Sequence, residues 1–272
     1  MKLIDSHVNL HHADFADDQA EVIARARAAG IGLMVTISDK LAHALQILPI
    51  AEGHDDIFAT IGTHPHEAKD NPDITPEDLL PFADHPKVVA FGETGLDYHY
   101  GFSPRDIQIA NFKAHIAASQ RSGLPLVVHT READEDCEQI LQTAYAEAPF
   151  KILMHCYTSG QRLADVAAEL GAWFSVSGIA TFKNAQAVRD VIATMPEDRI
   201  ILETDCPYLA PVPMRGKRNE PSFLPHVAAK LAEIRGWSLE ETAQRTNTAC
   251  LRLFDKITVP DALRTELMGT TA

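Results

Sequence analysis

Eight short, strongly apolar runs recur along the chain, and a longer amphipathic stretch separates most of them from the next. The runs are rich in Val, Ile and Leu, which is typical of strands that are buried on both faces of a parallel sheet. We predict strands at Lys2–Asp5, Gly32–Ile37, Ile57–Ile61, Val88–Glu93, Leu126–His129, Lys151–His155, Trp173–Val176 and Ile200–Glu203.

The stretches between the runs carry the apolar spacing of helices that cover a core. Gly30 and Gly123 stand where helices commonly end, and Ser238 precedes Glu241 by three residues, as at a helix start. We predict helices at Asp17–Ala29, Lys40–Glu52, Pro76–Ala83, Pro104–Ser122, Ala133–Ala146, Gly160–Leu170, Asn184–Thr194, Ser222–Arg235 and Ser238–Phe254.

This alternation indicates repeated βα units, which build either a closed eight-stranded barrel or an open doubly wound sheet. The count of eight strands favours the barrel. So does the absence of a glycine-rich phosphate loop after the first run, where the chain reads SHVNLHH in place of GxGxxG. We expect a single-domain, TIM-type (β/α)8 barrel over residues 1–260 and a C-terminal tail at 261–272.

The formal net charge of −14 argues against a protein that coats nucleic acid non-specifically, because Lys and Arg normally drive phosphate binding. Bound metal ions would add positive charge that this count omits, so an enzyme acting on phosphates stays open. The chain has no apolar run of membrane-spanning length and no secretory signal, and its four cysteines are scattered. We expect a cytoplasmic protein with no membrane contact and no obligate protein partner.

Side chains that bind metal ions stand at the ends of the predicted strands. Active sites of TIM barrels form at the carboxyl ends of the strands, so these side chains would converge on one point. Taken singly, each has an ordinary explanation, such as a hydrogen-bonded loop histidine, a helix cap or a salt bridge to Arg131. Convergence explains all of them together. The residues are His7, Glu93, His129, His155 and Asp205.

Three imidazoles with two carboxylates suit Zn²⁺, Mn²⁺ or a similar ion, because the mixed nitrogen and oxygen set matches ions of intermediate hardness. A glutamate between two groups of ligands can bridge two ions, which then clamp the oxygens of an in-line displacement and activate a water. We therefore expect a hydrolase with one or two divalent ions, Mg²⁺, Mn²⁺ or Zn²⁺.

Six sequence blocks stand around these positions. They are DSHVNL (5–10), GTHPH (62–66), GETGLDYHY (92–100), HTREADED (129–136), MHCYTSG (154–160) and ETDCPYLAPVPMRGKRNEP (203–221). Through these blocks the chain resembles, over nearly its whole length, the TatD family of metal-dependent deoxyribonucleases within the amidohydrolase-like barrels. The resemblance implies a (β/α)8 barrel with up to two divalent ions and cleavage of phosphodiester bonds by a metal-activated water.

Carried over position by position, the resemblance implies that His7, Glu93 and Asp205 hold one ion. Glu93, His129 and His155 would hold the second, so that Glu93 bridges the pair. Glu93 and Asp205 would be the catalytic carboxylates, and Asp205 would orient or deprotonate the attacking water.

One position departs from the family pattern, which has HxH on the first strand. Here Asn9 replaces the second histidine. Residues two apart point to the same side of a strand, so we expect Asn9 to face the site as a metal ligand weaker than imidazole. His11 has the same parity and would compensate only if the strand continues that far.

Residues on the neighbouring loops are candidates for substrate contacts. Arginines can bind phosphate oxygens in pairs of hydrogen bonds, and aromatic rings can stack on bases. The basic run at 215–218 could equally be an ordinary solvated surface, and the aromatic rings could pack the rim. The substrate-binding candidates are His64, Arg131, Tyr157, Tyr208, Arg215, Lys217 and Asn219.

Three functions stay open at this point. The first, which the resemblance implies, is a 3′–5′ exonuclease acting on DNA ends or another phosphorylated substrate. The second is a hydrolase of a different bond, such as an aminoacyl ester or amide, as in D-aminoacyl-tRNA deacylases; fold alone does not decide between them. The third is a degenerate barrel used as a binding module, for which only Asn9 argues.

Overall fold

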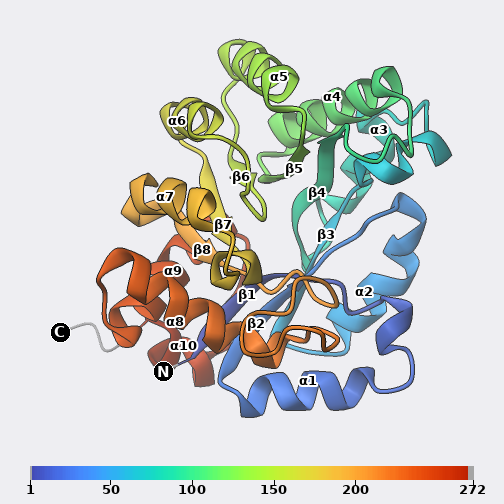
Figure 1. The fold of residues 1–272 in the computed structure, drawn as a ribbon. Coiled ribbons are helices and arrows are strands. Elements are labelled where there is room, and N and C mark those ends of the chain that lie inside the picture. The colour runs from blue at the N-terminus through green and yellow to red at the C-terminus, as the bar shows by residue number, and fades with distance from the viewer. Residues whose placement is uncertain (1, 269–272) are drawn as a thin grey trace.

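Eight parallel strands form a ring, and helices surround it, in the computed structural model, which describes residues 2–268 (Figure 1). Each strand pairs with the next one along the chain, from β1 to β8. The strands are β1 (Leu3–Val8), β2 (Ile31–Thr36), β3 (Ile57–Ile61), β4 (Val88–Asp97), β5 (Leu126–Arg131), β6 (Ile152–Met154), β7 (Trp173–Val176) and β8 (Ile200–Leu202).

Hydrogen bonds between the first and last strands close the ring just beyond β8. The backbone N–H of Asp205 donates to the carbonyl of His7 at 3.0 Å, and that of Asn9 donates to Cys206 at 3.0 Å. Asp5 on β1 accepts the backbone N–H of Thr204 at 2.9 Å. These bonds and a parallel bridge between Val8 and Cys206 join β1 to the segment after β8. The barrel is nearly closed, and the predicted TIM-type (β/α)8 barrel is confirmed over the open doubly wound sheet.

The helices lie between the strands in the predicted order, with short 3-10 turns at several of their ends. They are α1 (Gln19–Ala28), α2 (Ala44–Glu52), α3 (Pro76–Leu79), α4 (Arg105–Ser122), α5 (Asp134–Glu147), α6 (Gln161–Glu169), α7 (Gln186–Thr194), α8 (Leu224–Arg235), α9 (Leu239–Leu253) and α10 (Asp261–Met268). The segment expected as a tail contributes α10, and residues 269–272 of that segment lie outside the described residues.

Alternate residues along the strands pack in two different apolar clusters. On β5, Leu126 and Val128 pack in the cluster beneath the surrounding helices, whereas Val127 packs in the cluster inside the barrel. His129 follows Val127 by two residues, so the pleat directs its side chain inward at the strand end. The same alternation applies to β6, where Leu153 packs in the inner cluster two residues before His155.

The C-terminal helices close the opposite end of the barrel. Leu253 and Phe254 at the end of α9 pack with the inner residues of the strands, and Leu267 of α10 joins them. This packing leaves the carboxyl ends of the strands as the open mouth of the fold. No helix between residues 2 and 268 is both long and apolar enough to span a membrane.

Three strands run further than the apolar pattern predicts. The pattern ends the first strand at Asp5, the fourth at Glu93 and the fifth at His129, whereas β1 ends at Val8, β4 at Asp97 and β5 at Arg131. The residues added to β1 and β4 include His7, Thr94 and Asp97, which are buried although they are polar. Apolar periodicity misses such residues because they are buried by one another rather than by a hydrophobic core.

Gly95 permits the close approach of β4 to β5 beside His129. Its φ is +137°, and a Cβ built there would overlap the carbonyl oxygen of His129. We expect Gly95→Ala to lower stability by about 2–4 kcal/mol, because the added methyl clashes with backbone and strains φ. Thermal unfolding measures this loss.

Gly101→Ala is the matched control for this substitution. Gly101 also has a positive φ, of +64°, but no atom lies within 4 Å of a Cβ built on it. The Gly101→Ala substitution should therefore lower stability only through backbone strain, by about 1 kcal/mol. Equal losses for the two variants would contradict the packing role of Gly95.

Candidate metal centre

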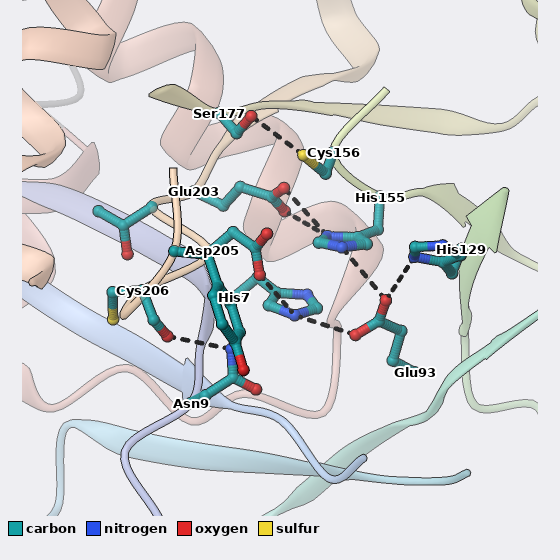
Figure 2. A network of polar contacts seen from close by, with 12 residues as sticks. His7, Asn9, Glu93, His129, His155, Cys156, Ser177, Glu203, Asp205 and Cys206 are labelled. Carbon is teal, nitrogen blue, oxygen red and sulfur yellow. Dashed lines mark hydrogen bonds and ion pairs between the residues drawn. The ribbon is translucent and has the colours of Figure 1, made fainter. Parts of the chain in front are cut away.

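The five predicted metal-binding side chains meet at the mouth of the barrel, where Figure 2 shows Glu93 between the imidazoles. They come from β1, β4 and β5 and from the segments that follow β6 and β8. His7 Nε2 lies 3.3 Å from Glu93 Oε2 and 3.5 Å from Asp205 Oδ1. The closed ring of strands thus brings together residues almost 200 positions apart in the sequence.

The two oxygens of Glu93 face different sets of side chains. Oε2 lies on the side of His7, and His7 in turn contacts Asp205. Oε1 lies 2.9 Å from His129 Nδ1 and 3.4 Å from His155 Nε2. Glu93 contacts no arginine among residues 2–268, so the salt bridge to Arg131 is not formed. Each oxygen can therefore serve a separate cation.

Most of these separations suit ligands of one ion better than hydrogen bonds. Atoms bound about 2.0–2.1 Å from a tetrahedral ion lie about 3.3 Å from each other. His7 lies 3.3 Å from Glu93 and 3.5 Å from Asp205. His155 lies 3.4 Å from Glu93. Hydrogen bonds from nitrogen to oxygen are usually about 2.9–3.0 Å long. The donor set fits a divalent ion on each side of Glu93.

His7 supplies a further test of that fit. Its side chain is 0% exposed, and neither ring nitrogen has a hydrogen-bond partner among the described residues. The ring stacks on His155 with the centroids 3.7 Å apart. A buried nitrogen left without a partner is costly, so the nitrogen that points between two carboxylates is suited to an ion rather than to protein groups.

His129 and His155 are each held by a second carboxylate on the far side of the ring. His155 donates from Nδ1 to Glu203 at 3.0 Å, and His129 donates from Nε2 to Asp97 at 3.1 Å. Histidines that bind metals usually donate their other N–H in this way, which fixes the ring and its tautomer. The nitrogens left over are the two that face Glu93.

Glu203 and Asp97 were not predicted as site residues, although both stand in blocks that carry the family resemblance. Glu203 is two positions before Asp205, and Asp97 is four positions after Glu93, so spacing along a strand gives a signal for both. Glu203 is fully buried, and Asp97 is 1% exposed. They position the imidazoles.

The cluster holds its charges in fixed states. Burial would raise the pKa of Glu93, but the imidazoles of His155, His64 and His7 hold it well below its usual value. Burial would likewise lower the pKa of His155, yet Glu203 and Glu93 raise it well above the ordinary value. Glu93 is therefore an anion at neutral pH, as a bridging ligand must be.

Asp205 has a different environment. Burial raises its pKa to about 6, against the opposing effect of His7 and His155. The residue has a φ of +55°, a left-handed conformation that aspartate tolerates better than most residues. The turn directs the carboxylate back towards His7 (Figure 2). A carboxylate with this pKa can take up a proton near neutral pH.

Asn9 lies at the edge of this group rather than within its contacts. The strand ends at Val8, and the side-chain amide of Asn9 donates to the carbonyl of Cys206 at 3.0 Å (Figure 2). Its Oδ1 makes no hydrogen bond within the described part of the chain. His11 does not compensate for Asn9, because it turns away to Asp39 at 3.1 Å.

Four of the substrate-binding candidates lie at the carboxyl ends of the strands or on the loops that follow them. His64 Nε2 lies 3.4 Å from Glu93 Oε1, inside the cluster of predicted metal ligands. Arg131 lies over the ring of Tyr100 at 4.8 Å. Arg215 and Lys217 are exposed on the loop that follows β8, with Arg215 over the ring of Phe182.

Two other candidates are corrected by their burial. Tyr157 is 3% exposed, packs edge-on against Phe174 and donates its hydroxyl to Gly160, so neither face of its ring is free for a base. Asn219 is fully buried and donates to the carbonyls of Thr204 and Tyr208, which makes it a brace of the loop after β8. Tyr208 remains half-exposed.

A TIM barrel with imidazoles and carboxylates clustered at the carboxyl ends of its strands defines the class of barrel-type, metal-dependent hydrolases. A family model described as TatD related DNase matches residues 4–255. The chain belongs to the TatD family of metal-dependent hydrolases.

Relatives and solved structures agree over almost the full chain. The chain is 40% identical to the uncharacterized metal-dependent hydrolase YabD of Bacillus subtilis, covering 93% of this chain and 98% of that protein. It is 35% identical to the 3'-5' ssDNA/RNA exonuclease TatD of Erwinia tasmaniensis, with 93% and 100% covered. The crystal structure of the TatD homologue YjjV from Escherichia coli matches with a TM-score of 0.86 at 27% identity, over 93% and 98% of the two chains.

Proposed function

We propose that this hydrolase removes nucleotides from the 3′ end of single-stranded DNA or RNA, the activity in the names of several relatives. In this proposal Glu93 bridges two divalent ions, Mg²⁺, Mn²⁺ or Zn²⁺. His7 and Asp205 complete the first ion's ligands, with Asn9 beside it, and His129 and His155 complete the second. The observation that carries the proposal is that the two oxygens of Glu93 face these two sets separately.

The catalytic work of the residues follows from their positions. Divalent ions held there supply Lewis-acid chemistry, because they polarise a phosphoryl oxygen and lower the pKa of water. Asp205 accepts the proton of the attacking water, because its carboxylate lies beside His7 on the first ion's side of Glu93. Glu203 and Asp97 keep the imidazoles in the required orientation.

Free cations on the rim support an anionic substrate. Arg131, Arg215 and Lys217 form no ion pair within residues 2–268, whereas Arg218 in the same basic run pairs with Asp18 at 2.7 Å. Unpaired guanidinium groups are suited to phosphate oxygens. In a chain with a net charge of −14, three unneutralised cations, one at the end of β5 and two on the loop after β8, favour a phosphate ligand.

Exposed aromatic rings on the same rim support a nucleic-acid substrate. Tyr100 and Phe102 follow β4 and stack with their centroids 5.1 Å apart, and both are about half-exposed. Arg131 covers one of these rings. Base stacking on such rings tolerates any sequence. Of the two tyrosines predicted as substrate contacts, only Tyr208 has an exposed ring on which a base could stack.

A second function has one observation in its favour. A pocket of about 650 Å³ opens beside the end of β5, and acidic side chains dominate the polar part of its wall. Such a lining favours an amino group over a phosphate, as in an aminoacyl ester or amide. The charged residues of the wall are Arg105, Arg131, Glu132, Asp134, Glu135 and Asp136.

Activity on two labelled substrates separates these functions. Purified protein with Mg²⁺ or Mn²⁺ should shorten 3′-labelled single-stranded DNA and leave an aminoacyl ester of tRNA intact. Ester cleavage without DNA trimming would establish the second function instead. Binding of DNA without cleavage of either substrate would indicate a barrel used only as a binding module.

Asn9 gives a prediction about the first ion. We expect Asn9→His to raise the affinity of this site by on the order of tenfold, about 1.4 kcal/mol, because imidazole is a better ligand than a neutral amide. Titration with Zn²⁺ against a chelating dye measures the change. Asn9→Ala is the control, since it also loses the hydrogen bond to Cys206. Equal affinities for both variants would show that position 9 does not reach the ion.

We also propose a cytoplasmic location. The four cysteines are all free, three of them buried, as is common in a reducing compartment.

A further inference from the structure

A second group of metal-binding side chains lies on the rim beside β1 and β2. His11 follows β1, Asp39 follows β2, and His43 ends the short 3-10 turn η2 (Leu41–His43). None of the three belongs to the cluster around Glu93. One atom from each lies within 4.8 Å of the atoms from the other two. Two imidazoles and one carboxylate form the donor set of many mononuclear sites for transition metals.

Both imidazoles point at the same oxygen. His11 Nε2 lies 3.1 Å and His43 Nδ1 lies 2.5 Å from Asp39 Oδ1. The rings are 5.0 Å apart and tilted by 57°, so their nitrogens approach the carboxylate from different directions. An ion bound about 2.1 Å from each donor would hold neighbouring ligand atoms about 3 Å apart, so His43 Nδ1 would lie further from Asp39 Oδ1 than it does here.

The hydrogen bonds within this group leave one atom of His11 and one of Asp39 without a partner among the described residues. The side chain of His11 is 5% exposed, and its Nδ1 has no hydrogen-bond partner within residues 2–268. Oδ2 of Asp39 makes no hydrogen bond to a described residue. The side chain of Asp39 is 37% exposed, so water can reach it, and no lysine or arginine among residues 2–268 pairs with its charge. A bound cation would compensate the carboxylate directly.

The group is connected to the mouth of the barrel. The carbonyl of Asp39 accepts the backbone N–H of His64, and the carbonyl of Ser38 accepts that of Glu93. Burial raises the pKa of Tyr208, and the charges of Asp205 and Asp39 both add to this rise. The second group therefore stands on the same face as the proposed catalytic centre, yet shares no ligand with it.

We propose that His11, Asp39 and His43 bind a further divalent transition-metal ion, such as Zn²⁺ or Mn²⁺, at a mononuclear site separate from the pair on Glu93. Three protein ligands leave coordination positions open to water or to an oxygen of the substrate. The site does not depend on the proposed exonuclease activity, because none of its ligands takes part in that reaction.

The number of bound ions tests this inference. Metal-stripped protein is dialysed against micromolar Zn²⁺, and its metal content is measured by mass spectrometry. His43→Gln and Asp39→Asn should each bind one Zn²⁺ fewer than the parent. His12→Gln is the matched control, because His12 neighbours His11 but contacts Tyr208 instead. It should keep the parental number.

Repeating the measurement with Glu93→Ala as the parent separates this site from the central one. The central ions are then removed in advance, and His43→Gln should still lower the content by one. Circular dichroism checks that each variant is folded. Because two different substitutions are measured, a folding defect in one of them does not decide the result. Full retention of the parental metal content by both variants, in both backgrounds, would overturn the inference whatever the fate of the proposed function.

Discussion

Replacing Glu93 by alanine should lower kcat/KM on single-stranded DNA by at least on the order of 10³-fold, and should release both central ions. The size of the expected loss in kcat/KM follows from the several kcal/mol by which metal ions stabilise charge in a phosphoryl-transfer transition state. Glu93 carries this effect because Oε1 and Oε2 face separate sets of imidazoles and carboxylates. Loss of one ligand therefore weakens both sites at once.

Metal content and steady-state rates measured on the same preparation test this prediction. Glu169→Ala is the control: it removes an exposed glutamate, on α6, that forms no ion pair within the described residues. It should leave both quantities unchanged. A Glu93→Ala protein that keeps both central ions would contradict the bridging role. Loss of only one ion would assign Glu93 to a single site.

Asp205→Asn should reduce kcat by about 10²- to 10⁴-fold, the usual contribution of a positioned general base. Asparagine keeps the shape and tolerates the left-handed backbone at φ +55°, but it cannot take a proton from water. The second ion, on the side of Glu93 Oε1, should stay bound because His129 and His155 are intact. Single-turnover kinetics with saturating substrate isolates the chemical step.

Asp73→Asn serves as the matched control, since Asp73 is exposed on a loop remote from these contacts. Its kcat should equal that of the parent. An Asp205→Asn enzyme with unchanged kcat would remove Asp205 from the proton transfer. A rise in KM alone would limit its role to substrate or metal binding.

The positions of the main site residues follow from the chain's periodicity. Short apolar runs predict where parallel strands end, and a barrel brings those ends together. His129 and His155 illustrate this: each follows an inward-facing apolar residue by two positions. Glu93 is similar, because a carboxylate after a wholly apolar run must lie among compensating groups. The structure brings these residues into contact, while their roles as metal ligands stay a proposal.

Other features could not be predicted because they depend on the path of loops. Tyr157 stands two positions after His155, and Asn219 lies on the loop after β8 with Arg215 and Lys217, yet the protein buries both. Apolar spacing carries no information about the direction in which a loop side chain turns. His11 shares the parity of His7, but the strand ends at Val8 and the parity rule ends with it.

The contacts between the histidines and their carboxylate partners could not be predicted from the sequence either. Glu203 and Asp97 are buried polar residues, and a pattern of apolar residues cannot show which ring each of them holds. The group of His11, Asp39 and His43 is a further case. Its members are spread over more than 30 positions, and they meet only because β1 and β2 are neighbours in the barrel.

Anomalous diffraction from crystals soaked in Mn²⁺ tests the central claim most directly, because it locates the ions without reference to activity. The account predicts two peaks that share Glu93, each about 2.0–2.3 Å from one of its oxygens. One peak should also contact His7 and Asp205, and the other His129 and His155. Strong Mn²⁺ peaks elsewhere, with none within about 3 Å of Glu93, would contradict it.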